Sequence, residues 1–222
     1  MFDEIVAEIA ADPLVVGIVL TGSHARGTAT AHSDIDLCVV TTGERPRKRT
    51  RHVDEFACTP ARLADTSDIW GRYAFRGARI LLDHGGVQEL VDKQATPTAE
   101  EARRWSREGL DGYANFLYRA AKSRRDGHVT AAALDEAESV SWLLLTIFAL
   151  HGRVRPYNKY LRWELETFPL GEPWADLPER ALREPAALFP HVERLARERG
   201  HGDVLDEWGD DLQLMRQPPG PA

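Results

Sequence analysis

The order of apolar and polar positions changes character along the chain. Up to about residue 95, short apolar runs rich in β-branched residues alternate with stretches rich in Gly, Ser, Thr and Asp, which is typical of strands and short helices joined by turns. The predicted elements are strands at Leu14–Leu20, Asp34–Val40, His52–Cys58 and Ala78–Leu82, and helices at Phe2–Ala11, just after Gly22, and at Ala61–Ala64.

Beyond Ala95-Thr96-Pro97, the apolar positions recur with the spacing of α-helices, and no segment predicts a strand. The predicted helices are Thr98–Arg125, Thr130–His151, Asn158–Thr167, Pro178–Arg183, His191–Arg199 and Val204–Leu214. We therefore expect an α/β (α+β) domain with a mixed sheet over residues 1–95, followed by an all-helical domain over residues 96–222.

Composition narrows the class of protein. Of the 222 residues, 43% are hydrophobic and 28% are charged, which is the balance of a globular protein rather than a disordered one. The formal net charge of −7 disfavours a polymeric nucleic acid as partner, because such partners usually require a clustered basic surface. A nucleotide remains compatible with this charge, since a metal pair and a few donors can neutralise a triphosphate.

Two further features bear on location. Cys38 and Cys58 lie within apolar runs, which indicates buried thiols rather than a disulfide framework. The chain opens with no charged-then-apolar leader, and no uninterrupted apolar stretch reaches about 18 residues. We therefore expect a cytoplasmic protein with no membrane partner.

The stretch LTGSHARGTATAHSDIDLCVV carries the candidate chemistry. Alternate side chains of a strand share a face, so Asp34 and Asp36 are expected to point the same way, about 6–7 Å apart. Two carboxylates at that distance repel each other unless a cation lies between them, and Mg²⁺ prefers such oxygen ligands. The alternative is that both aspartates merely open the strand as turn residues, although Asp is unfavourable in strands.

Gly22 and Ser23 are expected just past the end of the preceding strand. Glycine allows the backbone to approach a ligand closely, and the N–H groups at a following helix start favour a phosphate. The alternative for Ser23 is a turn-capping serine. Beside the aspartate pair, this segment predicts a metal–triphosphate site. The basic run RPRKRTR (residues 45–51) is expected to be solvated, with contact to a phosphate or an acceptor as the alternative.

The Gly-Ser pair, its spacing to Asp-Ile-Asp and the surrounding strands resemble the DNA polymerase β-like nucleotidyltransferases, over about residues 14–60. Small bacterial members, including the minimal nucleotidyltransferases and the aminoglycoside adenylyltransferases, look most similar. The resemblance implies two Mg²⁺ ions on Asp34 and Asp36, and nucleotide binding by Gly22, Ser23 and Ser33. It also implies a third carboxylate on the next strand, either Asp54 or Glu55. Four strand residues separate Asp54 from Thr59-Pro60, a spacing that looks like that of related enzymes, so the resemblance favours Asp54.

The helical half offers two further candidates. Lys159, in RPYNKYLRWEL, is similar to a lysine with which related enzymes reach the triphosphate, where it would offset charge on departing pyrophosphate. Glu136 precedes the apolar run VSWLLLTIFAL and could accept the proton of an acceptor hydroxyl or bind a cationic acceptor. The alternatives are a surface lysine and an acid that merely favours the first helical turns.

The sequence thus predicts a magnesium-dependent nucleotidyltransferase that moves a nucleoside monophosphate, AMP from ATP in the favoured version, onto a hydroxyl of a small acceptor such as an aminoglycoside-like antibiotic. One alternative is an antitoxin-type transferase that modifies a protein or tRNA. The other is a nucleotide-binding regulator without catalysis, against which the intact Asp34 and Asp36 pair argues. The acceptor itself is not predicted, because acceptor pockets are added to a shared core.

Overall fold

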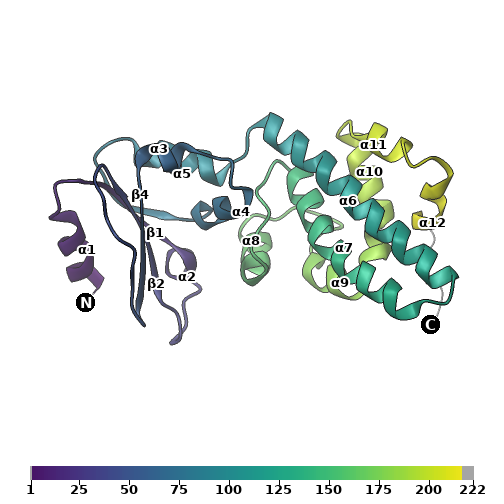
Figure 1. Ribbon diagram of the computed structural model, residues 1–222, viewed down its shortest axis with the longest axis horizontal. Helices are drawn as coiled ribbons and strands as arrows, with labels where there is room; N and C mark the ends of the chain where they lie inside the picture. The colour runs from purple at the N-terminus through teal and green to yellow at the C-terminus, as the bar shows by residue number, and fades with distance from the viewer. Residues whose placement is uncertain (1, 217–222) are drawn as a thin grey trace. The chain divides into compact units, whose positions relative to one another are not determined.

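The computed structural model describes residues 2–216, and the chain divides between Thr96 and Pro97 into two compact units. The first, called here the N-terminal unit, contains the sheet, and the second, the helical unit, is built from helices (Figure 1). The predicted fold class, a mixed sheet followed by helices, is confirmed. No helix within residues 2–216 has the length and apolar character needed to cross a membrane.

One five-stranded sheet, in the order β3-β4-β2-β1-β5, organises the N-terminal unit. Strand β2 is antiparallel to β1 and parallel to β4, and the outer strands β5 and β3 pair antiparallel with β1 and β4. The strands are β1 (Val15–Thr21), β2 (Ile35–Thr41), β3 (Lys48–Arg49), β4 (Val53–Cys58) and β5 (Arg79–Asp83). The predicted strands are confirmed, with boundaries that differ by at most one residue.

Helices cover both faces of the sheet. Helix α1 (Phe2–Ala10) packs Ile9 against apolar side chains of β1 and β2 on one face. On the other face, α3 (Pro60–Ala64) and α5 (Val87–Ala95) pack over the side chains of Cys38 and Val40. Figure 1 shows α1 on one side of the sheet and α3 and α5 on the other. These two apolar layers hold the central strands, and therefore the residues at the strand ends, in a defined register.

In the N-terminal unit, the sequence pattern did not predict four elements, namely β3, α4 (Ile69–Arg72), the 3₁₀ turn η1 (Tyr73–Phe75) and α5. Helix α5 begins because Asp83, at the end of β5, accepts hydrogen bonds from the backbone N–H groups of residues 85–88. Those bonds, with the one from Gln88 foremost, lower the pKa of Asp83 to about 2. The carboxylate of Asp83 therefore accepts hydrogen bonds from backbone N–H groups at the helix start that have no partner within the helix.

The helical unit is built around α6 (Ala99–Arg125) and α7 (Val129–Leu150), which pack along each other. Thr98 and Glu101 form a capping box at the start of α6. A Cβ at Gly109 would lie 2.8 Å from Oγ1 of Thr146, so glycine allows this close approach. The remaining elements are η2 (Asn158–Tyr160), α8 (Leu161–Thr167), α9 (Leu177–Arg183), η3 (Pro185–Leu188), α10 (Phe189–Glu198), α11 (Gly202–Asp206), η4 (Gly209–Asp211) and α12 (Leu212–Arg216).

One predicted helix is wrong in its continuity. The segment Val204–Leu214 is divided among α11, the 3₁₀ turn η4 and α12. Gly209 adopts a φ of +53°, which right-handed helical backbone does not allow, so the chain turns at this residue.

Candidate functional site

The two predicted metal-binding aspartates lie at the start of β2. Asp34 immediately precedes the strand and Asp36 is its second residue, and both side chains are half-buried. Asp36 lies opposite Thr21 of β1 and opposite Asp54 of the parallel strand β4. Because Asp36 shares its face with Cys38 and Val40, it continues the row of side chains that α3 and α5 cover further along the strand.

Gly22 lies directly against the carboxylate of Asp36. It begins helix α2 (Gly22–Arg26) with a φ of +64°, and a Cβ at this position would lie 1.9 Å from Oδ2 of Asp36. Any larger residue would therefore meet the carboxylate itself, besides adopting a strained backbone. Ser23, the next residue, is buried. The structure thus brings the glycine-serine bend and Asp36 into direct proximity.

Arg26 ties this bend to the rest of the unit. Its guanidinium donates hydrogen bonds to the carbonyl oxygens of Gly22 (2.9 Å), Tyr73 (2.8 Å) and Ala74 (3.3 Å) and lies over the Tyr73 ring. Arg26 is only 7% exposed. A buried arginine that binds three carbonyl groups orients the backbone, so its role is to hold the position of Gly22.

The two candidates for the third carboxylate point to opposite faces of the sheet. Asp54 is in register with Asp36 in a parallel pair, so the two side chains lie next to each other on one face. Glu55 lies on the α1 face, is 2% exposed, and accepts a 2.6 Å hydrogen bond from Arg45, which also contacts Asp12 at 3.2 Å. Glu55 therefore belongs to a buried ion network rather than to the surroundings of Asp36.

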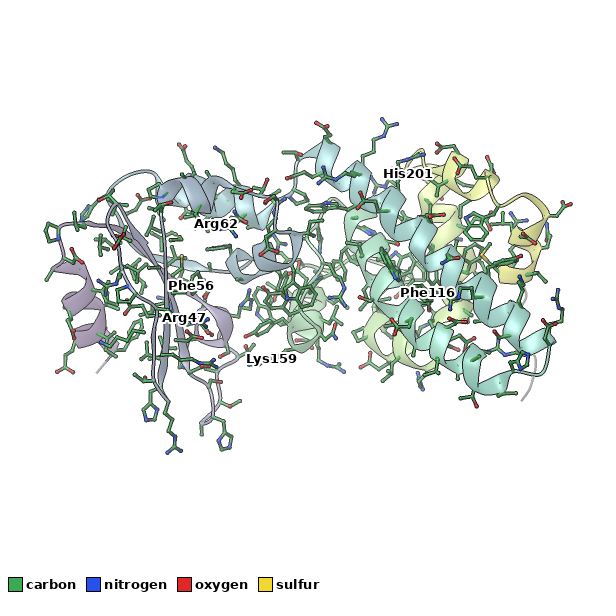
Figure 2. All side chains as sticks on the ribbon, viewed as in Figure 1. Arg47, Phe56, Arg62, Phe116, Lys159 and His201 are labelled. Carbon is green, nitrogen blue, oxygen red and sulfur yellow. The ribbon has the colours of Figure 1, made fainter. Side chains whose placement is uncertain are left out.

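Asp54 itself is held by arginines. Arg47 donates from Nε and Nη2 to the two carboxylate oxygens of Asp54, at 3.0 and 2.6 Å, and Nε of Arg49 lies 3.7 Å away. The hydrogen bonds from Arg47 lower the pKa of Asp54 below its ordinary value. Figure 2 labels Arg47 beside the strands of the sheet. In the described part of the chain, no three His, Cys, Asp or Glu side chains are grouped as metal ligands.

Sequence reasoning missed the contact of Arg47 with Asp54. For Arg47 the signal was the basic run of residues 45–51, which was expected to be solvated or to contact a phosphate. Three of its arginines contact carboxylates of β4, because β3 folds back beside that strand, and residues 46–51 are exposed as expected. The third predicted nucleotide-binding residue, Ser33, lies in a turn in which its hydroxyl accepts the N–H of Thr30 at 2.9 Å.

Lys159 and Glu136 both belong to the helical unit. Lys159, labelled in Figure 2, is exposed, and its ammonium lies 5.3 Å from the centroid of the Tyr160 ring. Glu136 accepts a 2.6 Å hydrogen bond from Arg124 of α6. These contacts lie within the helical unit, so the roles of both residues toward a nucleotide or an acceptor stay predictions.

Comparison with known proteins identifies the class. Residues 2–94 match the model of the nucleotidyltransferase domain family. This match covers nearly all of the N-terminal unit and confirms the predicted resemblance to the DNA polymerase β-like nucleotidyltransferases. The chain is also similar to the crystal structure of a nucleotidyltransferase-like protein from Exiguobacterium sibiricum 255-15, with 15% identity, a TM-score of 0.46, and coverage of 92% of this chain and 77% of that one. No curated protein matches the chain.

Proposed function

We propose that this protein is a magnesium-dependent nucleotidyltransferase that transfers a nucleoside monophosphate, AMP from ATP, to a hydroxyl of a small-molecule acceptor and releases pyrophosphate. The observation that supports this most is the contact of Gly22 with the carboxylate of Asp36, with Asp54 in register beside it, inside a nucleotidyltransferase domain. A backbone without a Cβ next to a carboxylate suits a polyphosphate that shares a cation with that carboxylate.

The chemical type of the proposed donors suits Mg²⁺. Asp34, Asp36 and Asp54 are carboxylates from two adjacent strands, the ligand type that Mg²⁺ prefers, and they leave the remaining positions of its shell to water and phosphate oxygens. When bound, two Mg²⁺ ions supply charge neutralisation on the triphosphate and lower the pKa of the acceptor hydroxyl.

The chain's own groups bind and orient the reactants. Gly22, Ser23 and Ser33 would contact the triphosphate, and Lys159 would offset charge on the departing pyrophosphate. In the transfer, a bond forms between the acceptor oxygen and the α-phosphorus, and the bond from that phosphorus to the bridging oxygen breaks. The hydroxyl proton would pass to Glu136, which must first exchange its hydrogen bond with Arg124.

The acceptor class is supported only by charge. A net charge of −7 suits a cationic acceptor such as an aminoglycoside-like antibiotic better than it suits tRNA. The matching experiment offers α-³²P-labelled NTPs with Mg²⁺ to a panel of aminoglycosides, to proteins and to tRNA. Label on a small molecule supports the proposal, label on a macromolecule supports the antitoxin-type alternative, and no transfer despite nucleotide binding supports a regulator.

Asp36→Asn provides the test of the site within the same assay. We expect transfer to fall by about 10²-fold or more, because the variant loses a charged metal ligand, while the fold is retained. Asp92→Asn is the matched control, since Asp92 is exposed on α5 and its removal changes the net charge by the same amount. Retention of more than a few per cent of the rate in Asp36→Asn would contradict the assignment.

A further inference from the structure

The arginines on Asp54 are placed there by strand register. Strand β3 pairs with the edge of β4 so that Arg49 lies opposite Asp54 and Lys48 opposite Glu55. Paired residues present their side chains to the same face, and residues two apart share that face. Arg47 and Arg49 are therefore directed to the face that carries Asp54 and Asp36, and Lys48 to the other, where it lies 4.0 Å from Glu8.

The electrostatics of this face require positive charge. Asp36 and Asp54 occupy paired positions of neighbouring strands, and Asp34 stands two residues from Asp36 on the same strand end. Like charges directly opposite each other in a sheet are destabilising unless a cation offsets them. The bidentate contact of Arg47 and the nearby Arg49 supply that charge from within the chain.

The ion pair between Arg47 and Asp54 is also suited to replacement of the arginine by a cation. The side chain of Asp54 is only 13% exposed, whereas those of Arg47 and Arg49 are 60% and 70% exposed. Arg47 can therefore move into solvent without burying its own charge, and a cation that takes its place keeps the nearly buried carboxylate of Asp54 neutralised. Arg45 on Glu55 differs, because that carboxylate is buried on the α1 face.

We propose that Arg47, assisted by Arg49, is an internal counter-ion that holds Asp54 in the metal-free protein and that a divalent cation must displace in order to reach this carboxylate. The inference rests on the proposed function, in which Asp54 is a metal ligand. Arg47 is thus a positioning residue: it keeps the carboxylates together before metal binds and competes with the metal for one of them. Removing it frees Oδ1 of Asp54 and leaves Arg49 3.7 Å from Oδ2.

The experiment measures binding rather than turnover. Mn²⁺, which accepts the same oxygen ligands and is paramagnetic, is titrated into the full chain and followed by electron paramagnetic resonance. We expect Arg47→Gln to bind Mn²⁺ about 2- to 5-fold more tightly than the wild type, the change that loss of one exposed ion pair corresponds to. Arg47→Lys keeps the charge without the bidentate geometry and should fall between the two.

Arg51→Gln is the matched control, because Arg51 is an exposed arginine of the same basic run and its removal changes the net charge equally. Mn²⁺ affinity in Arg47→Gln that equals or falls below that of Arg51→Gln would overturn the inference. A second readout is melting without metal: Arg47→Gln should melt lower than Arg51→Gln and gain more from added Mn²⁺, because Asp54 has lost its bidentate counter-ion. An equal gain in the two variants would also overturn it.

Asp36→Asn separates the two proposals. If it abolishes Mn²⁺ binding while Arg47→Gln leaves the affinity unchanged, the metal site stands and only the counter-ion role fails. If neither the wild type nor Arg47→Gln binds Mn²⁺ at millimolar concentration, the metal site and the counter-ion role both fail. Binding that appears only in Arg47→Gln supports the counter-ion role most directly.

Discussion

Adjacent residues of β4 carry arginine-paired carboxylates on opposite faces of the sheet. On the α1 face, Glu55 is buried and bound by Arg45, which also contacts Asp12. On the other face, Asp54 lies beside Asp36 and is held by exposed arginines. The residue types are the same, but burial differs, so the first cluster is expected to stabilise the fold and the second to exchange its partners.

The largest effect is expected from a substitution of Gly22, the glycine beside Asp36 on the face that carries Asp54. Gly22→Ala should lower kcat/KM by about 10²-fold, because the new Cβ displaces the carboxylate by about an ångström or more. It should also lower the free energy of unfolding by about 1–3 kcal/mol through backbone strain. Steady-state kinetics and urea unfolding measure the two effects.

Gly27→Ala is the control for the glycine test. Gly27 has a similar φ of +71°, but a Cβ there would meet nothing within 4 Å. This variant should therefore show the strain without the loss of activity. Equal activity loss in the two variants would show that backbone strain, rather than displacement of Asp36, causes the defect.

The next largest effect is expected on the free energy of unfolding, in a direct comparison of Glu55 with Asp54. Glu55→Gln should lower the free energy of unfolding by about 2–4 kcal/mol, because a buried pair is broken, though Arg45 keeps some access to solvent. Asp54→Asn should change it by less than about 1 kcal/mol, since lost ion pairs and relieved repulsion oppose each other. Urea unfolding at neutral pH measures both.

For Mn²⁺ affinity, Asp54→Asn should have the larger effect and Glu55→Gln the smaller one. We expect the affinity to be unchanged in Glu55→Gln and weakened in Asp54→Asn, because only Asp54 lies beside Asp36. Similar Mn²⁺ affinities for the two variants would remove the distinction between the faces.

The smallest effect is a pH dependence at a third carboxylate, Asp83, which is bound by backbone N–H groups instead of arginine. Its pKa is lowered to about 2 from an unfolded value near 3.9. A lowered pKa contributes stability that is fully present above the unfolded value and is lost as the pH falls toward the folded value. The difference in melting temperature between the wild type and Asp83→Asn should therefore be constant above about pH 5 and shrink between pH 4 and pH 2. A difference that does not depend on pH would contradict this.

Local pattern was sufficient for most elements of the fold. The β-branched runs predicted the central strands, and the capping residues and apolar spacing predicted α3, α6 and α7. The same local information did not predict β3, which consists of two residues that are both exposed. It also did not predict α5, whose start depends on Asp83. It also missed the break at Gly209, since a glycine in a helical pattern has no local sign of its φ.

The sequence by itself determined the strands, the helices that follow them and the resemblance of the first part to a nucleotidyltransferase domain, because strand period, turn residues and the Gly-Ser and Asp-x-Asp spacing are short-range properties. Only the tertiary structure decided which neighbours the charged groups have. Asp54 faces Asp36 and binds Arg47, Glu55 is buried with Arg45, and Glu136 pairs with Arg124. Those partners come from other segments of the chain, so they depend on register and packing rather than on any pattern within one segment.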